Sequence, residues 1–248
     1  NKLDVTATQR NAIREGLIRL SHSSSRTLTE LQSTIQDRDI RQALEFYTLA
    51  GEMGSVLDAT HDDLKAGRFQ VFEMGNLIQK GPARLIPTIS YLFHQIKKRT
   101  KQNKPTLIIV EEVRNFLDGK FGEQLEQWGL ELRKDNASAI YLAQDPSQII
   151  NTRYKENLLN SCYNKIFLSN RDAATEINAP NYHAVGLTDK QIDIIKNAIP
   201  KKHYYVTSSL GNRLIDLGLG QLALSFVGVD SAADRKQVDH LIEQYGEQ

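Results

Sequence analysis

The chain has 248 residues, of which 40% are hydrophobic and 25% are charged, and its formal net charge at pH 7 is +1. This composition excludes a disordered or collagen-like chain, and it excludes a strongly basic surface, so any contact with nucleic acid has to be local. No apolar run approaches the ~20 residues of a membrane-spanning helix, and the single cysteine, Cys162, favours a reducing compartment. We therefore expect a soluble intracellular protein. Because residue 1 is Asn and not Met, we also expect the polypeptide to continue upstream.

The first 66 residues contain helical patterns and no strand pattern. Thr6 with Gln9 forms the sequence of a capping box, and apolar residues recur after it at helical spacing. A second helical pattern extends from about residue 29 to residue 50. We expect residues 1–66 to form an all-helical subdomain.

From residue 67 the pattern changes to strands that alternate with helices. Strand patterns cover residues 68–72, 106–110, 138–144 and 164–168, and helical patterns cover residues 85–96, 121–132 and 188–199. Strands separated by helices of this length form right-handed βαβ units with a parallel sheet. The strand at 106–110 is aliphatic enough to be buried on both faces. These patterns predict an α/β core over residues 67–229.

The C-terminal region has a different pattern. Residues 203–208, 212–219 and 223–228 indicate a small antiparallel edge to the sheet. A last amphipathic helix follows, with Asp230 or Ser231 as its N-cap. We expect residues 230–248 to form a separate C-terminal helix.

Polar side chains follow three of the predicted strands at the point where each strand ends. Glu111 and Glu112 follow the first of these strands, Gln144 follows the second, and Ser169 and Asn170 follow the third. In open α/β sheets the ligand crevice lies at the carboxyl ends of the strands, and two carboxylates there can handle a metal and a water. The alternatives are that the acids only begin the next helix, where the helix dipole favours them, and that Gln144 only binds loop backbone.

Six sequence stretches, in their order and spacing, resemble the energising ATPases of type IV secretion and conjugative DNA transfer, of the TrbE/CagE and VirB type. The stretches are SYLFHQI, LIIVEEVRNFLD, WGLELRKDNASAIYLAQDPSQI, NKIFLSN, GLTDKQIDIIK and LGLGQLALSFVG. The resemblance covers residues 68–230. It implies the Walker B half of a RecA-like P-loop NTPase domain, with a largely parallel sheet and helices on both faces. Residues 1–66 then correspond to an inserted helical subdomain.

The resemblance also implies the cofactors ATP and Mg²⁺ and a role for each polar residue at the strand ends. Glu111 occupies the first acidic position, which is usually Asp in the family, and would bind Mg²⁺ through water. Glu112 would polarise the attacking water. Gln144 would sense the γ-phosphate, and Asn170 would contribute to nucleotide binding.

The same resemblance implies a ring-shaped homo-oligomer, expected to be a hexamer, in which one subunit completes the site of the next. Arg133 would reach the nucleotide of a neighbouring subunit, and Arg171 is a second candidate for this role. The alternative for Arg133 is a basic residue that complements a helix C-terminus. The implied partners are other inner-membrane components of a type IV secretion system, with DNA or a coupling protein in addition. The implied location is the cytoplasmic side of the bacterial inner membrane.

The phosphate-binding motif of such enzymes, G-x-x-x-x-G-K-[ST], is absent from this sequence. We expect it upstream in the full-length protein, with loss of the motif as the alternative, and we expect the chain alone to be inactive. A DNA-pumping translocase of the same superfamily and a nucleotide-free scaffold are the alternative functions. The basic run KKRTKQNK at residues 97–104 is either a nucleic-acid contact or a solvated helix end, and no aromatic residue interrupts it.

Overall fold

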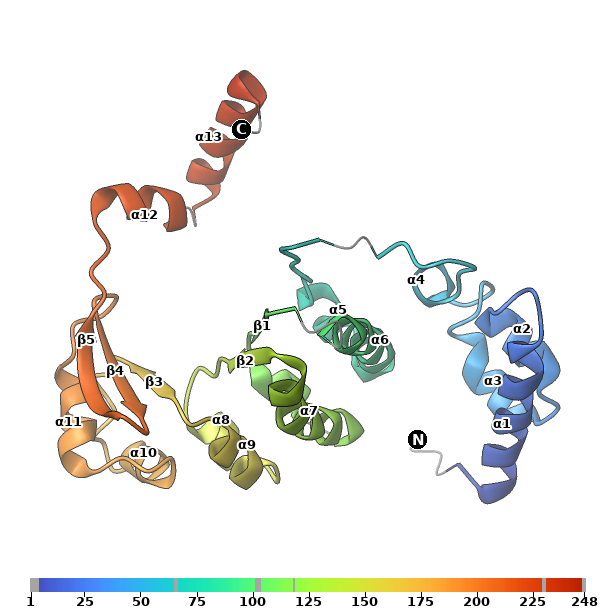
Figure 1. The fold of residues 1–248 in the computed structure, drawn as a ribbon, viewed down its shortest axis with the longest axis horizontal. Helices are drawn as coiled ribbons and strands as arrows, with labels where there is room; N and C mark the ends of the chain where they lie inside the picture. The colour runs from blue at the N-terminus through green and yellow to red at the C-terminus, as the bar shows by residue number, and fades with distance from the viewer. Residues whose placement is uncertain (1–4, 65–66, 101–103, 118, 229–230, 247–248) are drawn as a thin grey trace. The chain divides into compact units, whose positions relative to one another are not determined.

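The structure is a computed structural model that describes residues 5–64, 67–100, 104–117, 119–228 and 231–246. Figure 1 labels its helices and strands. The chain divides into two compact units, Asn1–Lys98 and Arg99–Gln248, and each unit is described by itself. The division of the sequence at residues 66 and 230 remains a prediction.

The first unit is helical in its described residues. Its elements are α1 (Ala7–Ser21), α2 (Leu28–Thr34), α3 (Arg38–Glu45), α4 (Gly54–Leu57), α5 (Gly75–Gln79) and α6 (Pro82–Thr100). The capping box of α1 is confirmed, because Gln9 N donates to Thr6 Oγ1 at 3.2 Å and Thr6 N donates to Gln9 Oε1 at 3.0 Å. The single helix predicted over 29–50 is wrong. Asp37 breaks the pattern, since its side chain accepts from Ile40 N at 3.0 Å and so begins α3.

Helices α1 and α2 lie close together because a glycine faces the contact. Gly16 of α1 is buried, and a methyl group in its place would lie 3.0 Å from Ile35 and 3.2 Å from Leu31. Leu31 and Ile35 are themselves buried. The close approach of α1 to α2 therefore depends on the absence of a side chain at Gly16.

A buried carboxylate, Asp58, joins three segments of the first unit. Its oxygens accept hydrogen bonds from Leu28 N at 2.5 Å and Thr29 N at 3.0 Å, which are the first amides of α2. The backbone N–H of Leu49 donates to the same carboxylate at 3.0 Å. Asp58 thus satisfies helix amides that α2 cannot pair internally, and it connects α2 to the segment before α4.

Helix α6 contains Pro87, as the helical pattern allowed. Proline has no N–H, so the carbonyl of Ala83, four residues earlier, loses its partner inside the helix. Tyr47 supplies the missing donor, since its hydroxyl binds Ala83 O at 2.8 Å. Arg84 of α6 also pairs with Glu52 and lies 5.3 Å from the centre of the Phe46 ring. These contacts connect α6 to the α3–α4 segment.

The strand predicted at 68–72 is wrong. These residues form bends and irregular backbone, and the side chains of Phe69 and Val71 are 86% and 74% exposed. A strand is stable only when a neighbour accepts and donates its backbone hydrogen bonds, and the described chain pairs no strand with this segment.

The second unit begins with a βαβ unit that positions the predicted acids. Its elements are β1 (Thr106–Val110), the 3₁₀ helix η1 (Val113–Phe116), α7 (Gly119–Leu132), the 3₁₀ helix η2 (Arg133–Asp135) and β2 (Ala137–Tyr141). Strands β1 and β2 are parallel, as predicted, with Thr106 opposite Ala137 and Val110 opposite Tyr141. Both strands therefore end at the same edge.

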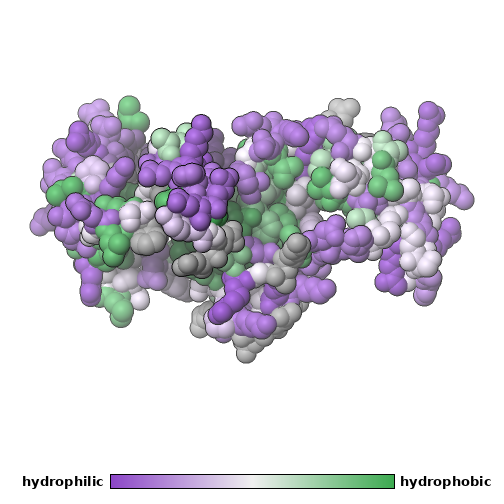
Figure 2. Space-filling view, turned by 90° about the horizontal axis from the view of Figure 1, so that it is seen from above, coloured by the Kyte–Doolittle hydropathy of each residue, from purple (hydrophilic) through white to green (hydrophobic). Residues whose placement is uncertain are grey.

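Only one face of β1 is buried. Ile108 and Val110 are buried, whereas Leu107 and Ile109 are 60% and 57% exposed. The prediction of a strand covered on both faces is therefore wrong for this chain. The alternation arises because successive side chains of a strand point to opposite faces. Figure 2 shows hydrophobic side chains among the hydrophilic ones on the molecular surface.

The rest of the unit contains a second sheet of opposite type. Its elements are α8 (Ser147–Ile150), α9 (Lys155–Ser161), β3 (Lys165–Leu168), α10 (Ala179–Ala184), α11 (Asp189–Asn197), β4 (His203–Ser208) and β5 (Gly211–Asp216). Strands β3, β4 and β5 form an antiparallel sheet in that order. The antiparallel pairing of residues 203–208 and 212–216 is as predicted, but residues 165–168 join this sheet and not the parallel one.

A separate core stabilises the antiparallel sheet. Its buried side chains come from α10, α11 and the strands, and include Tyr182, Ile192, Ile195 and Tyr205. The hydrogen bond from Thr188 N to Gln191 Oε1 at 2.8 Å begins α11 where the sequence predicted it. The two sheets thus have separate supporting helices within one unit.

Two helices, α12 (Gln221–Val227) and α13 (Ala232–Tyr245), follow the second sheet. The strand predicted at 223–228 is wrong, because these residues lie in or directly after α12. Ser231 is the N-cap of α13 and accepts from Asp234 N at 3.0 Å, while Asp230 lies outside the described residues. Among the helices described, none is both long and apolar enough to cross a membrane.

Candidate active site

The predicted site lies where β1 and β2 end. Hydrogen bonds continue past both strands, from Leu142 N to Val110 O at 3.0 Å and from Val113 N to Leu142 O at 2.9 Å. These two bonds bracket Glu111 and Glu112 and hold their turn against the segment that leads to Gln144. The parallel register thus brings residues together that are more than thirty positions apart in sequence.

Glu112 has an unusual backbone conformation for a residue with a side chain. Its φ and ψ are 49° and 52°, in the left-handed region, which costs about 1 to 2 kcal/mol for an L-residue. The turn persists because the next residue, Val113, is fully buried and begins η1, with Phe116 buried behind it. Such strain in a well-held turn is typical of functional sites.

Two side-chain amides hold the carboxylate of Glu112. Asn115 Nδ2 donates to Glu112 Oε2 at 3.1 Å, and Gln144 Nε2 donates to Glu112 Oε1 at 3.3 Å. The structure thus brings Glu112 and Gln144 together, as the sequence suggested. Glu111 lies exposed in the same turn, and among the described residues no side chain binds its carboxylate.

Asn115 is a member of this cluster that sequence reasoning missed. It lies three residues after Glu112, in η1, and its backbone N–H also donates to Glu112 O at 2.9 Å. The sequence carried only a weak signal, an amide side chain shortly after an acid. The contact depends on the left-handed turn at Glu112, which the sequence does not reveal.

Asn170 does not join the cluster. Its Nδ2 donates to the Tyr182 hydroxyl at 3.0 Å, and its Oδ1 accepts from Asp172 N at 3.0 Å. The expectation that three strand ends converge is therefore wrong for this strand. The reason is topological, because β3 pairs with β4 in the antiparallel sheet and not with β2.

Tyr182 interacts with residues that follow both β2 and β3. Burial raises the pKa of its hydroxyl, the bond from Asn170 acts in the opposite direction, and the negative charge of Asp145 raises the pKa further. Asp145 directly follows Gln144 in the sequence. The loop after β2 is therefore near the residue that Asn170 binds, although Asn170 itself contacts neither Glu112 nor Gln144.

The two predicted arginines occupy different places. Arg133 begins η2, and its side chain lies outside the described portion of the structure. Arg171 is exposed in the turn after β3, where it lines a hollow of about 580 Å³ with Lys196 and residues 197–200. This hollow carries positive charge at its rim, but no contact joins it to Glu112.

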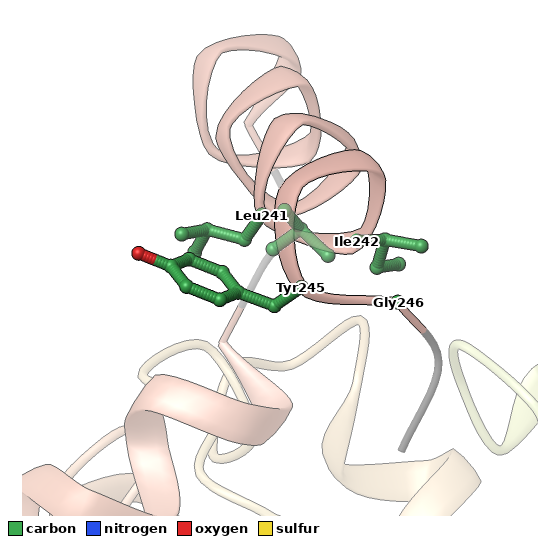
Figure 3. A pocket seen from close by; sticks show the side chains of 5 residues that line it. Leu241, Ile242, Tyr245 and Gly246 are labelled. Atoms are coloured by element: carbon green, nitrogen blue, oxygen red, sulfur yellow. The ribbon is translucent and has the colours of Figure 1, made fainter.

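A second hollow, of about 430 Å³, lies along α13. Figure 3 shows Leu241, Ile242 and Tyr245 projecting from that helix, and Val238 and Gly246 complete the lining. These residues come from one amphipathic helix and its C-cap, so the hollow belongs to an exposed apolar stripe. It shares no residue with the strand-end cluster.

The basic run at 97–104 and the single cysteine give no second site. Lys98 and Lys104 are exposed, Lys97 and Arg99 are half-buried, and residues 101–103 lie outside the described residues. Burial is the largest cause that raises the pKa of the Cys162 thiol. A thiol with a raised pKa remains protonated at neutral pH, which favours a structural role over a reactive one.

Comparison with known proteins identifies relatives along nearly the whole chain, although no family model matches it. The chain is 37% identical to the conjugal transfer protein TrbE of Rhizobium radiobacter over 98% of its own length and 30% of that protein. It is 35% identical to a probable TrbE conjugal transfer protein of Sinorhizobium fredii, over 97% of the chain and 36% of that protein. The chain thus spans about one third of the length of these relatives.

More distant similarity extends to type IV secretion proteins. The chain is 21% identical to the type IV secretion system protein virB4 of Bartonella henselae over 80% of its length and 26% of that protein. In the solved structure of VirB4 from Thermoanaerobacter pseudethanolicus, the matching region covers 89% of this chain and 66% of that chain, with a TM-score of 0.66 and 15% identity. This likeness shows a shared α/β fold. The chain is therefore similar in sequence to about one third of the length of the TrbE conjugal transfer proteins, and more distantly to the virB4 type IV secretion proteins.

Proposed function

We propose that this chain is the Walker B half of a TrbE/VirB4-type ATPase, which hydrolyses ATP to power conjugative transfer or type IV secretion. The observation that supports this most directly is the strand-end cluster, in which Gln144, after the end of β2, binds Glu112, after the end of β1. An acid beside a polar side chain at the carboxyl edge of parallel strands suits phosphoryl transfer, because one group can orient the attacking water while the other responds to the γ-phosphate.

The residues present fit one half of an Mg-ATP site. Among the described residues, no three His, Cys, Asp or Glu side chains are placed to hold a metal ion by themselves. Mg²⁺ needs no such cage, since it usually keeps several waters and binds through one or two carboxylates and substrate phosphates. The exposed carboxylate of Glu111 suits that mode of binding. The phosphate-binding loop is the half that this sequence does not contain.

Each acid then has its own task. Bound Mg²⁺ would neutralise charge on the phosphates, and Glu111 would hold it through water. The carboxylate of Glu112 would orient and polarise the attacking water, and the Gln144 amide would respond to the γ-phosphate. Asn170 is left out of this set because its amide binds Tyr182.

The assembly belongs to the same proposal. Arg133 follows α7 on the segment that leads into β2, and we assign it to the nucleotide of a neighbouring subunit. Arg171 is the second candidate for that task, because it is exposed beside Lys196. The full-length protein would then act as a homo-hexamer at the cytoplasmic side of the inner membrane, together with other secretion components.

Glu112→Gln in the full-length protein tests the proposal. Glutamine keeps the size of the side chain and one of its two acceptor oxygens but removes the negative charge. We expect Mg-ATP binding at least equal to that of the wild type and hydrolysis at least ~10²-fold slower, the scale of a lost general base. Binding is measured with a fluorescent ATP analogue, and hydrolysis is measured as phosphate release.

Glu126→Gln is the matched control. Glu126 lies on α7, where its carboxylate binds the amide of Asn157 away from the strand ends. This variant loses the same charge and should hydrolyse ATP at the wild-type rate. If Glu112→Gln also hydrolyses at the wild-type rate, the acids only begin a helix and the proposal is wrong. If the full-length wild type binds no ATP, the proposed function is wrong and the alternative, a nucleotide-free scaffold, is favoured.

A further inference from the structure

We infer that Asn115 is a positioning residue, which holds the carboxylate of Glu112 in its working orientation. This inference rests on the proposed function and adds a residue to it. Asn115 Nδ2 lies 3.1 Å from Glu112 Oε2, and Asn115 N lies 2.9 Å from Glu112 O. One residue therefore binds both the side chain and the backbone of the acid.

The segment that carries Asn115 is well anchored. Val113 is fully buried, and Phe116 and Leu117 are 8% and 4% exposed. The backbone bond from Leu117 N to Arg114 O at 3.1 Å closes the turn of η1. Asn115 is half-buried between these anchors. Its amide is therefore a fixed donor, because its own backbone cannot move without exposing apolar side chains.

Gln144, the other donor, is held less firmly. It is exposed after the end of β2, its contact with Glu112 Oε1 is longer at 3.3 Å, and its backbone N–H binds the side chain of Gln148 at 3.2 Å. A side chain in this position can leave Glu112 and turn to a phosphate. When it does, Asn115 remains to hold the carboxylate.

The firmly held donor, Asn115, should matter for catalysis. Glu112 has several rotatable bonds, and without a donor its carboxylate would sample many orientations above a strained turn. A misplacement of about 1 Å at a reacting group costs up to ~10²-fold in rate. Asn115 should therefore affect turnover and leave nucleotide affinity nearly unchanged, since its side chain binds the carboxylate of Glu112.

The test uses Asn115→Ala and Asn115→Asp in the full-length protein, with steady-state ATP hydrolysis as the readout. The Asp variant keeps the side-chain size and replaces the donor with a second carboxylate, so it breaks the bond even if the Ala variant folds poorly. We expect kcat to fall by about 10-fold or more in both variants, with KM for ATP within about twofold of the wild type.

A double variant separates positioning from a merely structural role. If Asn115 acts through Glu112, Asn115→Ala combined with Glu112→Gln should be no slower than Glu112→Gln alone. Asn157→Ala is the matched control, since it removes another Asn–Glu hydrogen bond, to Glu126, and should leave kcat unchanged.

Four outcomes would overturn the inference. A wild-type kcat in Asn115→Asp, or losses that multiply in the double variant, would remove Asn115 from the mechanism while Glu112→Gln still supports the proposed function. Equal loss of kcat in Asn157→Ala would show that any broken Asn–Glu contact has the same effect. A wild-type rate in Glu112→Gln would overturn the inference and the proposed function together.

Discussion

Asp58, in the first unit, and Glu112, in the second, are both carboxylates that accept several hydrogen bonds, and their surroundings differ in every other respect. Asp58 is 4% exposed and binds three backbone amides from two distant segments. Glu112 is exposed and binds two side-chain amides. Asp58 lies where the chain needs an acceptor for its own backbone. Glu112 lies on a strained turn that places its carboxylate between two side-chain amides.

The comparison shows how the two kinds of acid can be told apart. A carboxylate that satisfies buried backbone donors contributes to the stability of the fold, because its removal leaves those donors unpaired. A carboxylate in a left-handed turn at a strand end reduces stability locally, which suggests a functional reason for it. Stability measurements on this chain can therefore test the distinction without any ATPase assay.

The largest expected effect is that of Asp58→Ala. The backbone N–H groups of Leu28 and Thr29 lose their acceptor, and that of Leu49 keeps only Thr29 Oγ1, so we expect the free energy of unfolding to fall by about 3 kcal/mol. Chemical denaturation of the purified chain measures this change. Asp37→Ala is the control, because Asp37 caps α3 through one bond, and its loss should cost about 1 kcal/mol. If both variants lose the same free energy of unfolding, Asp58 contributes no more to stability than an ordinary helix cap.

A buried hydroxyl without a partner extends the comparison to alkaline pH. Among the described residues, the Tyr141 hydroxyl has no hydrogen-bond partner, and burial, followed by the charge of Cys162, raises its pKa to about 12. The unfolded chain loses this proton near pH 10 and the folded chain keeps it, so stability falls as pH rises from about 10 to 12.

Tyr141→Phe removes that dependence. Near neutral pH the free energy of unfolding of the variant should lie within about 0.5 kcal/mol of the wild-type value, because no hydrogen bond is lost. Near pH 12 the wild type should have lost roughly 2 to 3 kcal/mol relative to the variant. Denaturation curves at a series of pH values compare the two proteins. Parallel stability profiles up to pH 12 would contradict the raised pKa.

The smallest expected effect has the opposite sign. Glu112→Gly places the residue that best tolerates a positive φ into the strained turn, so we expect a gain of about 0.5 to 1 kcal/mol in the free energy of unfolding. Asn115→Gly is a suitable comparison. Asn115 lies in the neighbouring 3₁₀ helix, so glycine at this position should lower the free energy of unfolding. A loss of stability in Glu112→Gly would mean that Glu112 is a structural acid like Asp58.

Local features of this fold could be predicted from the sequence with good accuracy. Two helix starts, the capping box at Thr6 and Gln9 and the start of α11 at Thr188, each depend on residues three positions apart. The local sequence is therefore sufficient to predict them. The strands at 106–110 and 203–208 are also at their predicted places. That Glu112 and Gln144 lie at one edge followed from one further rule, that parallel strands end at the same edge, whereas the hydrogen bond between them was not predicted.

Features that depend on non-local pairing could not be predicted in this way. Residues 68–72 have strand-like composition but no strand beside them in the described chain, and residues 165–168 pair with β4 and not with β2. This second difference separates Asn170 from Glu112. Composition measures how well a segment suits a strand, but the neighbour that completes its hydrogen bonds is chosen by the whole chain.

The sequence by itself determined the α/β class, the first helix and its cap, and the acids and the amide at the carboxyl ends of β1 and β2, because each depends on periodicity or on close neighbours. Tertiary structure alone decided the left-handed turn at Glu112, the contact of Asn115 with its carboxylate, the burial of Asp58 and the sheet that β3 joins. The physical reason is that a backbone conformation against local preference persists only where surrounding contacts hold it, and those contacts come from segments distant in sequence.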